Sequence, residues 1–135
     1  MLYFAYGSNL HHQQMKRRCK DSKFLKKFIL LNYKLNFRSR YRAADIERKK
    51  DSFVLGALFE ISKSDEKKLD VYEDFPTLYK KKFFKYYNKK VMTYIMTKKT
   101  PFRYPTIRYL NIIKQGYNDC DLDKKHLIKS LQNFL

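Results

Sequence analysis

Residues 52–61 constrain the fold more than any other segment of the sequence. They read Ser-Phe-Val-Leu-Gly-Ala-Leu-Phe-Glu-Ile and are nearly apolar throughout. A continuous apolar run of this length is typical of a strand buried on both faces, so a central place in a sheet is predicted. Gly56 lies inside the run, where a glycine indicates either a bulge or the close approach of another backbone.

Further strand patterns surround this run. Alternating or aromatic apolar residues predict strands at residues 2–6, 31–37, 78–88 and 91–97, a bend or break within residues 24–37, and a short strand at residues 43–46. The charged residues 38–42 are predicted to form a loop, and the polar residues 47–51 a turn.

Helix signals lie between and after the strands. Ser8 and Asn9 can cap a helix over residues 10–18, and Ser62 and Asp65 have capping-box spacing for a helix that ends near Glu73. Two more helices are predicted, one beginning near Pro105 and one over residues 122–134, with Leu127, Leu131 and Phe134 on its apolar face. This order predicts an α+β fold: a small, mostly antiparallel, mixed, β-barrel-like sheet with flanking helices.

The length and composition favour one domain over residues 1–135. The chain has 44% hydrophobic residues, which is enough for a core, and no linker rich in Pro, Gly or Ser. It shows no signal-peptide pattern and no window near the roughly 20 apolar residues of a membrane span. Cys19 and Cys120 lack metal-ligand spacing. A cytoplasmic protein with reduced thiols is expected, although a disulfide stays possible.

The formal net charge of +18 is unusual and has two interpretations. The chain has 31 Lys and Arg residues but only 13 Asp and Glu residues, and such an excess of positive charge can attract nucleic acid or another polyanion. The basic residues are spread along the whole chain without the pattern of an RNA-binding sheet. A solvated lysine surface is therefore favoured over a nucleic-acid partner, which stays an alternative.

The turn after the first predicted strand is a candidate binding corner. Gly7 ends the strand, and Ser8 and Asn9 open a helix. Several backbone N–H groups then point to one place, where the helix end adds a positive partial charge of about half a unit. A carboxylate, a phosphate or a developing oxyanion suits such a corner.

The octapeptide Tyr-Phe-Ala-Tyr-Gly-Ser-Asn-Leu at residues 3–10 resembles the signature of the gamma-glutamylcyclotransferase-like family. Residues 56–61 (Gly-Ala-Leu-Phe-Glu-Ile), 69–73 (Leu-Asp-Val-Tyr-Glu), Pro76 and 79–81 (Tyr-Lys-Lys) follow the family pattern in the same order. Residues 109–113 resemble a helix of its small, single-domain bacterial members. The resemblance spans nearly the whole chain.

This resemblance implies a small β-barrel-like fold with flanking helices and a cyclisation reaction. The α-amine of a γ-glutamyl group attacks its own γ-carbonyl, which gives 5-oxoproline and a free amine. Glu73 matches the catalytic carboxylate. Tyr6, Gly7, Ser8, Asn9 and Leu10 match the loop that holds the glutamyl group, and Tyr79 falls where the family has a substrate-contacting tyrosine. Asp74 departs from the glycine that commonly follows the catalytic Glu.

The chemistry agrees with this assignment. One carboxylate can take the proton of the substrate ammonium and return it to the departing amine, and it does so best when burial raises its pKa toward neutrality. Ring closure supplies the effective concentration, so neither a metal nor a cofactor is expected, and the adjacent His11 and His12 are interpreted as a surface pair. The leaving amine and the oligomeric state stay open, with glutathione disfavoured. The alternative function is a non-enzymatic basic module of the same fold that binds a polyanion.

Overall fold

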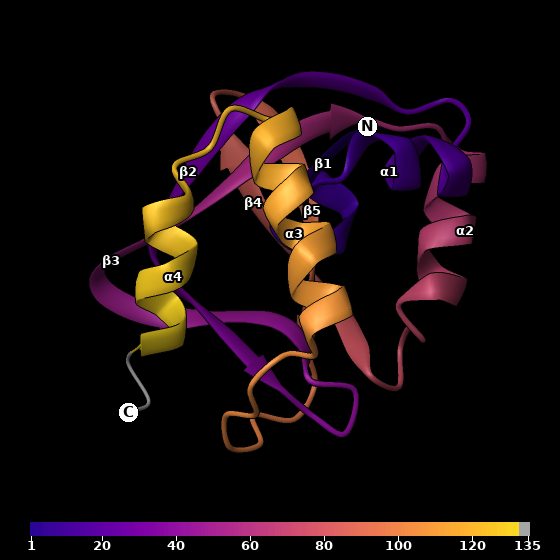
Figure 1. The fold of residues 1–135 in the computed structure, drawn as a ribbon. Coiled ribbons are helices and arrows are strands. Elements are labelled where there is room, and N and C mark those ends of the chain that lie inside the picture. Colours follow the sequence, from indigo (N-terminus) through magenta and orange to yellow (C-terminus); the bar gives the residue numbers. More distant parts are fainter. Residues whose placement is uncertain (133–135) are drawn as a thin grey trace.

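The computed structural model describes residues 1–132 as one mixed sheet with helices around it (Figure 1). The five strands lie in the order β2-β3-β1-β5-β4. Their bounds are β1 Leu2–Ala5, β2 Lys23–Arg38, β3 Ala43–Glu60, β4 Tyr79–Tyr86 and β5 Lys89–Met96. The helices are the 3₁₀ turn η1 Ser8–Leu10 and the α-helices α1 His12–Arg18, α2 Lys63–Tyr72, α3 Ile107–Asp119 and α4 Lys124–Gln132.

The pairing of the strands confirms the predicted fold class. β1 runs antiparallel to β3 and parallel to β5, whereas β2–β3 and β4–β5 are antiparallel hairpins. The sheet is not closed, because β2 and β4 are its two edges. These edges nevertheless touch through side chains: the Phe28 and Phe84 rings stack with centroids 5.9 Å apart, and Lys26 Nζ donates to Tyr86 Oη at 3.0 Å. The result is barrel-like without a continuous ladder.

The β2–β3 hairpin corrects one prediction and confirms another. Residues 47–51 were predicted to form a turn, but they belong to β3 and pair with β2, as in Tyr33 opposite Arg48. Their side chains are mostly exposed to solvent. The polar pattern of these residues therefore reflects an exposed strand and not a turn. The bend predicted within residues 24–37 is present, because the register shifts between Leu31 and Tyr33, and Asn32 has φ 64°.

The starts of α2 and α3 follow capping residues, whereas the start of α1 differs from the prediction. Ser62 and Asp65 form the predicted capping box of α2, with both reciprocal hydrogen bonds. Ser8 and Asn9 do not cap a helix as predicted: residues 8–10 form a 3₁₀ turn, and α1 begins only at His12, where the His11 side chain accepts from Gln14 N–H. Thr106 caps α3 through its side chain, one residue after Pro105. The prediction for Phe134 lies outside the described residues.

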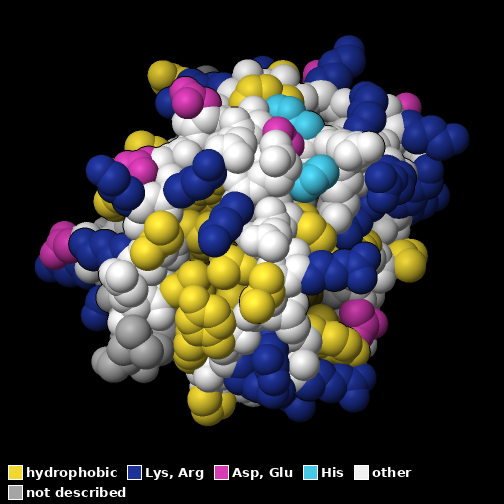
Figure 2. Space-filling model, viewed as in Figure 1, with side chains coloured by type: hydrophobic (Ala, Val, Ile, Leu, Met, Phe, Trp, Pro, Cys, Tyr) yellow, Lys and Arg dark blue, Asp and Glu magenta, His cyan; other side chains and the backbone are white. Residues whose placement is uncertain are grey.

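The helices cover two sides of the sheet (Figure 1). α3 and α4 lie in front of the strands in this view, and α1 and α2 pack together at the right. Figure 2 shows the face that α3 and α4 cover, with Lys and Arg scattered around its rim and apolar side chains gathered in its middle. The positive charge on this face is therefore not confined to one element.

Gly56 is a point of close backbone approach. The pairing of β2 with β3 runs through Gly56 without a register shift, so no bulge occurs there. A Cβ at this position would lie 2.3 Å from the Ala5 carbonyl oxygen and 2.5 Å from the Phe4 ring. Phe4 is fully buried and packs edge-on against Phe28 and Phe84. The absence of a side chain at Gly56 lets β1 and its Phe4 ring sit at the centre of the core.

The Gly56→Ala substitution is expected to destabilise the protein by about 3 kcal/mol, because the added methyl group meets backbone as well as a buried ring. Urea unfolding followed by circular dichroism measures this change. Leu31→Ala, at a mostly exposed position in the same hairpin, should cost less than about 1 kcal/mol. Equal losses in the two variants would refute the close-approach explanation.

Candidate active site

A cavity of about 540 Å³ opens where β1 ends, next to the C-terminal end of α2 and the start of β3. Seven of its 16 lining residues are tyrosines, and the only carboxylates among them are Glu73 and Asp74. The lining residues are Tyr3, Tyr6, Gly7, Ser8, Asn9, Tyr41, Ala43, Ala44, Val71, Tyr72, Glu73, Asp74, Leu78, Tyr79, Tyr94 and Tyr109. Its walls are thus aromatic, with one acidic side.

Glu73 reaches the cavity because α2 ends in a Schellman motif. Glu73 is the C-cap, Asp74 N–H donates to the Val71 carbonyl at 3.2 Å, and Phe75 N–H donates to the Asp70 carbonyl at 2.9 Å. This motif needs a left-handed residue after the C-cap, and Asp74 has φ 51°. Asp tolerates that conformation better than most residues, so the turn is retained without a glycine.

Burial raises the pKa of the Glu73 carboxyl to about 7, and the nearby Arg18 cation opposes this shift. The residue is half-buried, and within residues 1–132 its carboxylate has neither a hydrogen-bond donor nor an ion-pair partner in contact. Water is partly removed from the carboxylate and no direct contact replaces it, so the neutral form is favoured. Near neutral pH, this carboxyl can both accept and donate a proton.

Three of the seven tyrosine hydroxyls around the cavity form hydrogen bonds with backbone groups. Tyr79 Oη donates to the Ala44 carbonyl at 2.6 Å, Tyr109 Oη accepts from Ala44 N–H at 3.0 Å, and Tyr6 Oη donates to the Tyr94 carbonyl at 2.6 Å. Burial raises the pKa of the Tyr6, Tyr79, Tyr94 and Tyr109 phenols above their usual range. They are therefore neutral at pH 7 and serve as rigid walls.

The predicted binding turn also faces this cavity. Leu10 N–H donates to the Gly7 carbonyl at 3.1 Å, which closes the 3₁₀ turn. The N–H groups of Ser8 and Asn9 come first in this turn and so have no partner inside it. A Cβ on Gly7 would lie 3.1 Å from the Ala44 Cβ, so glycine keeps this side of the cavity open.

The structure brings together six of the seven predicted site residues: Glu73, Tyr6, Gly7, Ser8, Asn9 and Tyr79 all line the cavity. Leu10 does not. Its side chain is fully buried and packs where Gly116 of α3 leaves room, since a Cβ there would lie 2.6 Å from the Leu10 Cβ.

Sequence reasoning missed two contributors, Arg18 and Ala44. Arg18 ends α1 and contacts both Asn9 and Tyr72, which line the cavity. Ala44 acts through its backbone N–H and carbonyl groups. Only the spacing of Arg18 after the Gly-Ser-Asn turn could have drawn attention to it, and nothing in an alanine reveals a role of its backbone.

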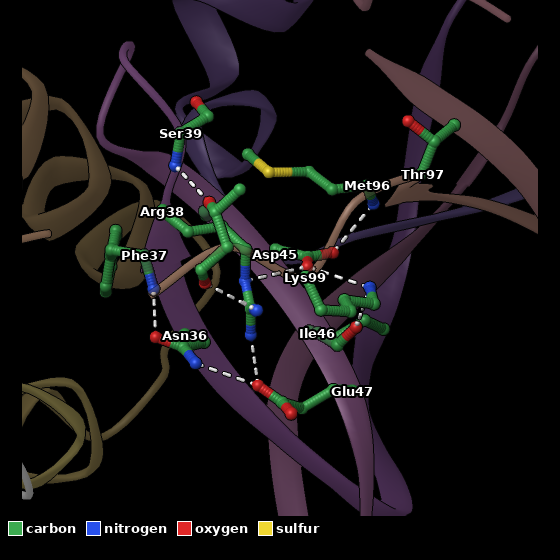
Figure 3. Close-up of polar contacts among 12 residues, drawn as sticks. Asn36, Phe37, Arg38, Ser39, Asp45, Ile46, Glu47, Met96, Thr97 and Lys99 are labelled. Carbon is green, nitrogen blue, oxygen red and sulfur yellow. Dashed lines mark hydrogen bonds and ion pairs between the residues drawn. The ribbon is translucent and has the colours of Figure 1, made fainter. Parts of the chain in front are cut away.

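A buried ion-pair network holds the wall that contains Ala44 (Figure 3). Asp45, which has no exposed surface, lies 3.1 Å from Arg38 Nε and 2.8 Å from Lys99 Nζ, and its other oxygen accepts the Met96 N–H at 2.8 Å. Arg38 also pairs with Glu47 and donates to the Thr100 carbonyl at 2.9 Å. The position of Ala44 is therefore fixed by the ion pairs of the next residue, Asp45, and by the hydrogen bonds of its own backbone with Tyr79 and Tyr109.

Neither a group of metal-binding side chains nor a helix that could span a membrane is found among residues 1–132. Within that range, no three His, Cys, Asp or Glu side chains are grouped to hold a metal ion. The helices there are also too short or too polar to cross a membrane.

Comparisons with known proteins agree with this geometry. The family model described as gamma-glutamyl cyclotransferase, AIG2-like, matches residues 3–116. None of the curated proteins compared with the sequence matches it. Among solved structures, one described as a gamma-glutamyl cyclotransferase has a TM-score of 0.77 and 24% identity, covering 96% of this chain and 85% of that one.

Two further structures share the fold. An uncharacterized protein from Homo sapiens has a TM-score of 0.76 and 24% identity, with the alignment covering 96% of this chain and 85% of the human one. YkqA from Bacillus subtilis has a TM-score of 0.80 and 20% identity over 98% of this chain, which spans only 53% of YkqA. At these identities the likeness concerns the fold alone.

The Asp45→Asn substitution is expected to destabilise the protein by about 3 kcal/mol, because it keeps an acceptor for the Met96 N–H but leaves Arg38 and Lys99 without their buried counter-charge. Glu47→Gln, which removes the partly exposed partner of the same Arg38, should cost about 1 kcal/mol. Urea unfolding of both variants compares them. A smaller loss for Asp45→Asn than for Glu47→Gln would contradict this ranking.

The Glu73→Gln substitution is expected to stabilise the protein at pH 8 by about 1–3 kcal/mol and to have much less effect at pH 5. In the unfolded chain this carboxyl ionises near pH 4.3, whereas in the folded protein its pKa is about 7. Between these values the folded state binds more protons, so the free energy of unfolding falls as pH rises, and glutamine removes that loss. Urea unfolding at both pH values tests this, and a pH-independent difference would contradict it.

Proposed function

The chain belongs to the gamma-glutamyl cyclotransferase, AIG2-like family, and from that premise we propose that it converts a γ-glutamyl amine or amino acid into 5-oxoproline and a free amine. The observation that carries this proposal is Glu73, a half-buried carboxyl with a pKa of about 7 in an aromatic cavity. The same cavity contains the Gly7, Ser8 and Asn9 turn.

Glu73 is proposed to move protons from the attacking nitrogen to the leaving amine. Its carboxylate first takes a proton from the α-ammonium group, which frees the nitrogen lone pair. That nitrogen attacks the γ-carbonyl carbon, so a C–N bond forms and the carbonyl oxygen becomes an oxyanion. The oxyanion then collapses, the original amide C–N bond breaks, and Glu73 returns the proton to the departing amine. The attacking nitrogen still carries one proton more than the lactam needs, and Glu73 passes this second proton to the released amine, so the products are neutral 5-oxoproline lactam and an ammonium. A pKa near the working pH suits both halves of this cycle.

The rest of the cavity is proposed to orient the glutamyl group. The N–H groups of Ser8 and Asn9, which have no partner within η1, can donate to an anionic oxygen of the substrate. Tyr6 and Tyr79 present their rings, because each hydroxyl proton is already donated to a backbone carbonyl. Walls fixed in this way hold the amine and the γ-carbonyl close together, where ring closure gains most from orientation.

The Glu73→Gln variant is expected to lower the rate of 5-oxoproline formation by about 10²–10⁴-fold, since glutamine cannot accept or return a proton. The wild-type protein and the variant are incubated with a panel of γ-glutamyl amino acids and γ-glutamyl amines, and 5-oxoproline is quantified. Glu66→Gln is the matched control: it also lies on α2, but it pairs with Lys81 outside the cavity and should leave the rate unchanged.

Two results would contradict the proposal in different ways. Product formation that survives the Glu73→Gln substitution would show that another group moves the proton. No product from any amide, together with salt-sensitive binding to single-stranded nucleic acid, would instead favour the basic binding module.

A further inference from the structure

We propose that Arg18 is a positioning residue of this site: its guanidinium joins Asn9 of η1 to Tyr72 of α2 and thereby fixes the binding turn relative to Glu73. The inference rests on the proposed function, because Arg18 itself does not line the cavity and acts through residues that do.

Arg18 contacts both η1 and Tyr72 of α2, and η1 and Tyr72 also contact each other. Its Nη1 donates to Asn9 Oδ1 at 2.5 Å and to Ser8 Oγ at 3.4 Å. The guanidinium carbon lies 3.4 Å from the centroid of the Tyr72 ring, which is a close cation–π stack. Ser8 Oγ lies 3.2 Å from Tyr72 Oη, so the turn and the helix end also touch directly.

Each partner of Arg18 is adjacent to a group that the reaction uses. Asn9 and Ser8 line the cavity and carry the N–H groups that are proposed to bind the substrate, and Asn9 Nδ2 donates to Tyr3 Oη at 3.0 Å. Tyr72 directly precedes Glu73 in the chain. A guanidinium can stack on a ring and donate in its own plane at the same time, whereas a lysine ammonium is a point charge that cannot reproduce both contacts.

Arg18 also acts on Glu73 by its charge, and it lowers the pKa of that carboxyl. The other groups coupled to Glu73 are the phenols of Tyr3, Tyr6, Tyr79, Tyr94 and Tyr109, which burial keeps neutral at pH 7. Of the nearest acids, Asp70 is paired with Lys81, and Asp74 is exposed. Among the described residues, Arg18 is thus the cation whose charge opposes the effect of burial on the pKa of Glu73.

Three variants separate geometry from charge. Arg18→Lys keeps the positive charge but loses the planar guanidinium donors and the stacking on the Tyr72 ring. Arg18→Met loses the charge, the donors and the stacking. Arg17→Met is the matched control, because Arg17 is the preceding residue of the same helix, carries the same charge and is exposed. For each variant we would measure kcat, KM, the pH profile of kcat/KM, the free energy of unfolding and, by carbon NMR, the titration of Glu73.

The expected results differ for each variant. Arg18→Lys should lower kcat at least about tenfold with little change in the acidic midpoint of the pH profile, since misplacement slows ring closure. Arg18→Met should lower kcat similarly and also raise that midpoint and the Glu73 titration by about half a pH unit or more. Arg17→Met should change neither. A wild-type kcat and midpoint in folded Arg18→Met, or a loss of stability alone, would overturn the inference.

The NMR titration separates this inference from the proposed function, because it needs no turnover. If the wild-type protein makes no 5-oxoproline from any substrate, the proposed function fails. A higher Glu73 midpoint in Arg18→Met would then still support the contact between Arg18 and this end of α2. An unchanged midpoint would overturn it.

Discussion

The geometry of the cavity depends on one buried anion, Asp45. Its carboxylate has no exposed surface and interacts with Arg38 of β2, the Met96 N–H of β5 and Lys99 beyond β5. Because the preceding residue, Ala44, bonds through its backbone to Tyr79 of β4 and Tyr109 of α3, the same anion also fixes these two walls. A charge that is costly to bury is thus stabilised where several elements meet, and removing one partner leaves the others uncompensated.

The carboxyl of Glu73 lies in an environment opposite to that of Asp45. Asp45 is surrounded by cations and donors, whereas Glu73 is placed against rings at the C-terminal end of α2, where the helix dipole further disfavours negative charge. Among residues 1–132, Arg18, held by Asn9 and Tyr72, is the group whose charge offsets these effects. One carboxyl stabilises the fold as an anion, and the other has a pKa raised to about 7, which costs stability as the pH rises.

The sequence predicted what local patterns encode, and little that depends on tertiary contacts. The strand around Gly56, the α2 capping box and the α+β class follow from periodicity and from capping residues, and the structure confirms them, with β3 as an interior strand between β2 and the middle strand β1. The strand at residues 47–51 escaped prediction because pairing with β2, and not burial, maintains it. The role of Ala44 is also invisible in the sequence, since it comes from backbone groups that meet Tyr79 and Tyr109 only after folding.

The left-handed Asp74 has a consequence for how relatives of this chain are found. The position after Glu73 requires a positive φ, which glycine meets most easily and which aspartate meets here at 51°. A search pattern that demands glycine at this point would discard the chain although the turn is intact. Describing that position by its backbone angles, and accepting Gly, Asn or Asp there, would recover divergent members that a residue-by-residue motif excludes.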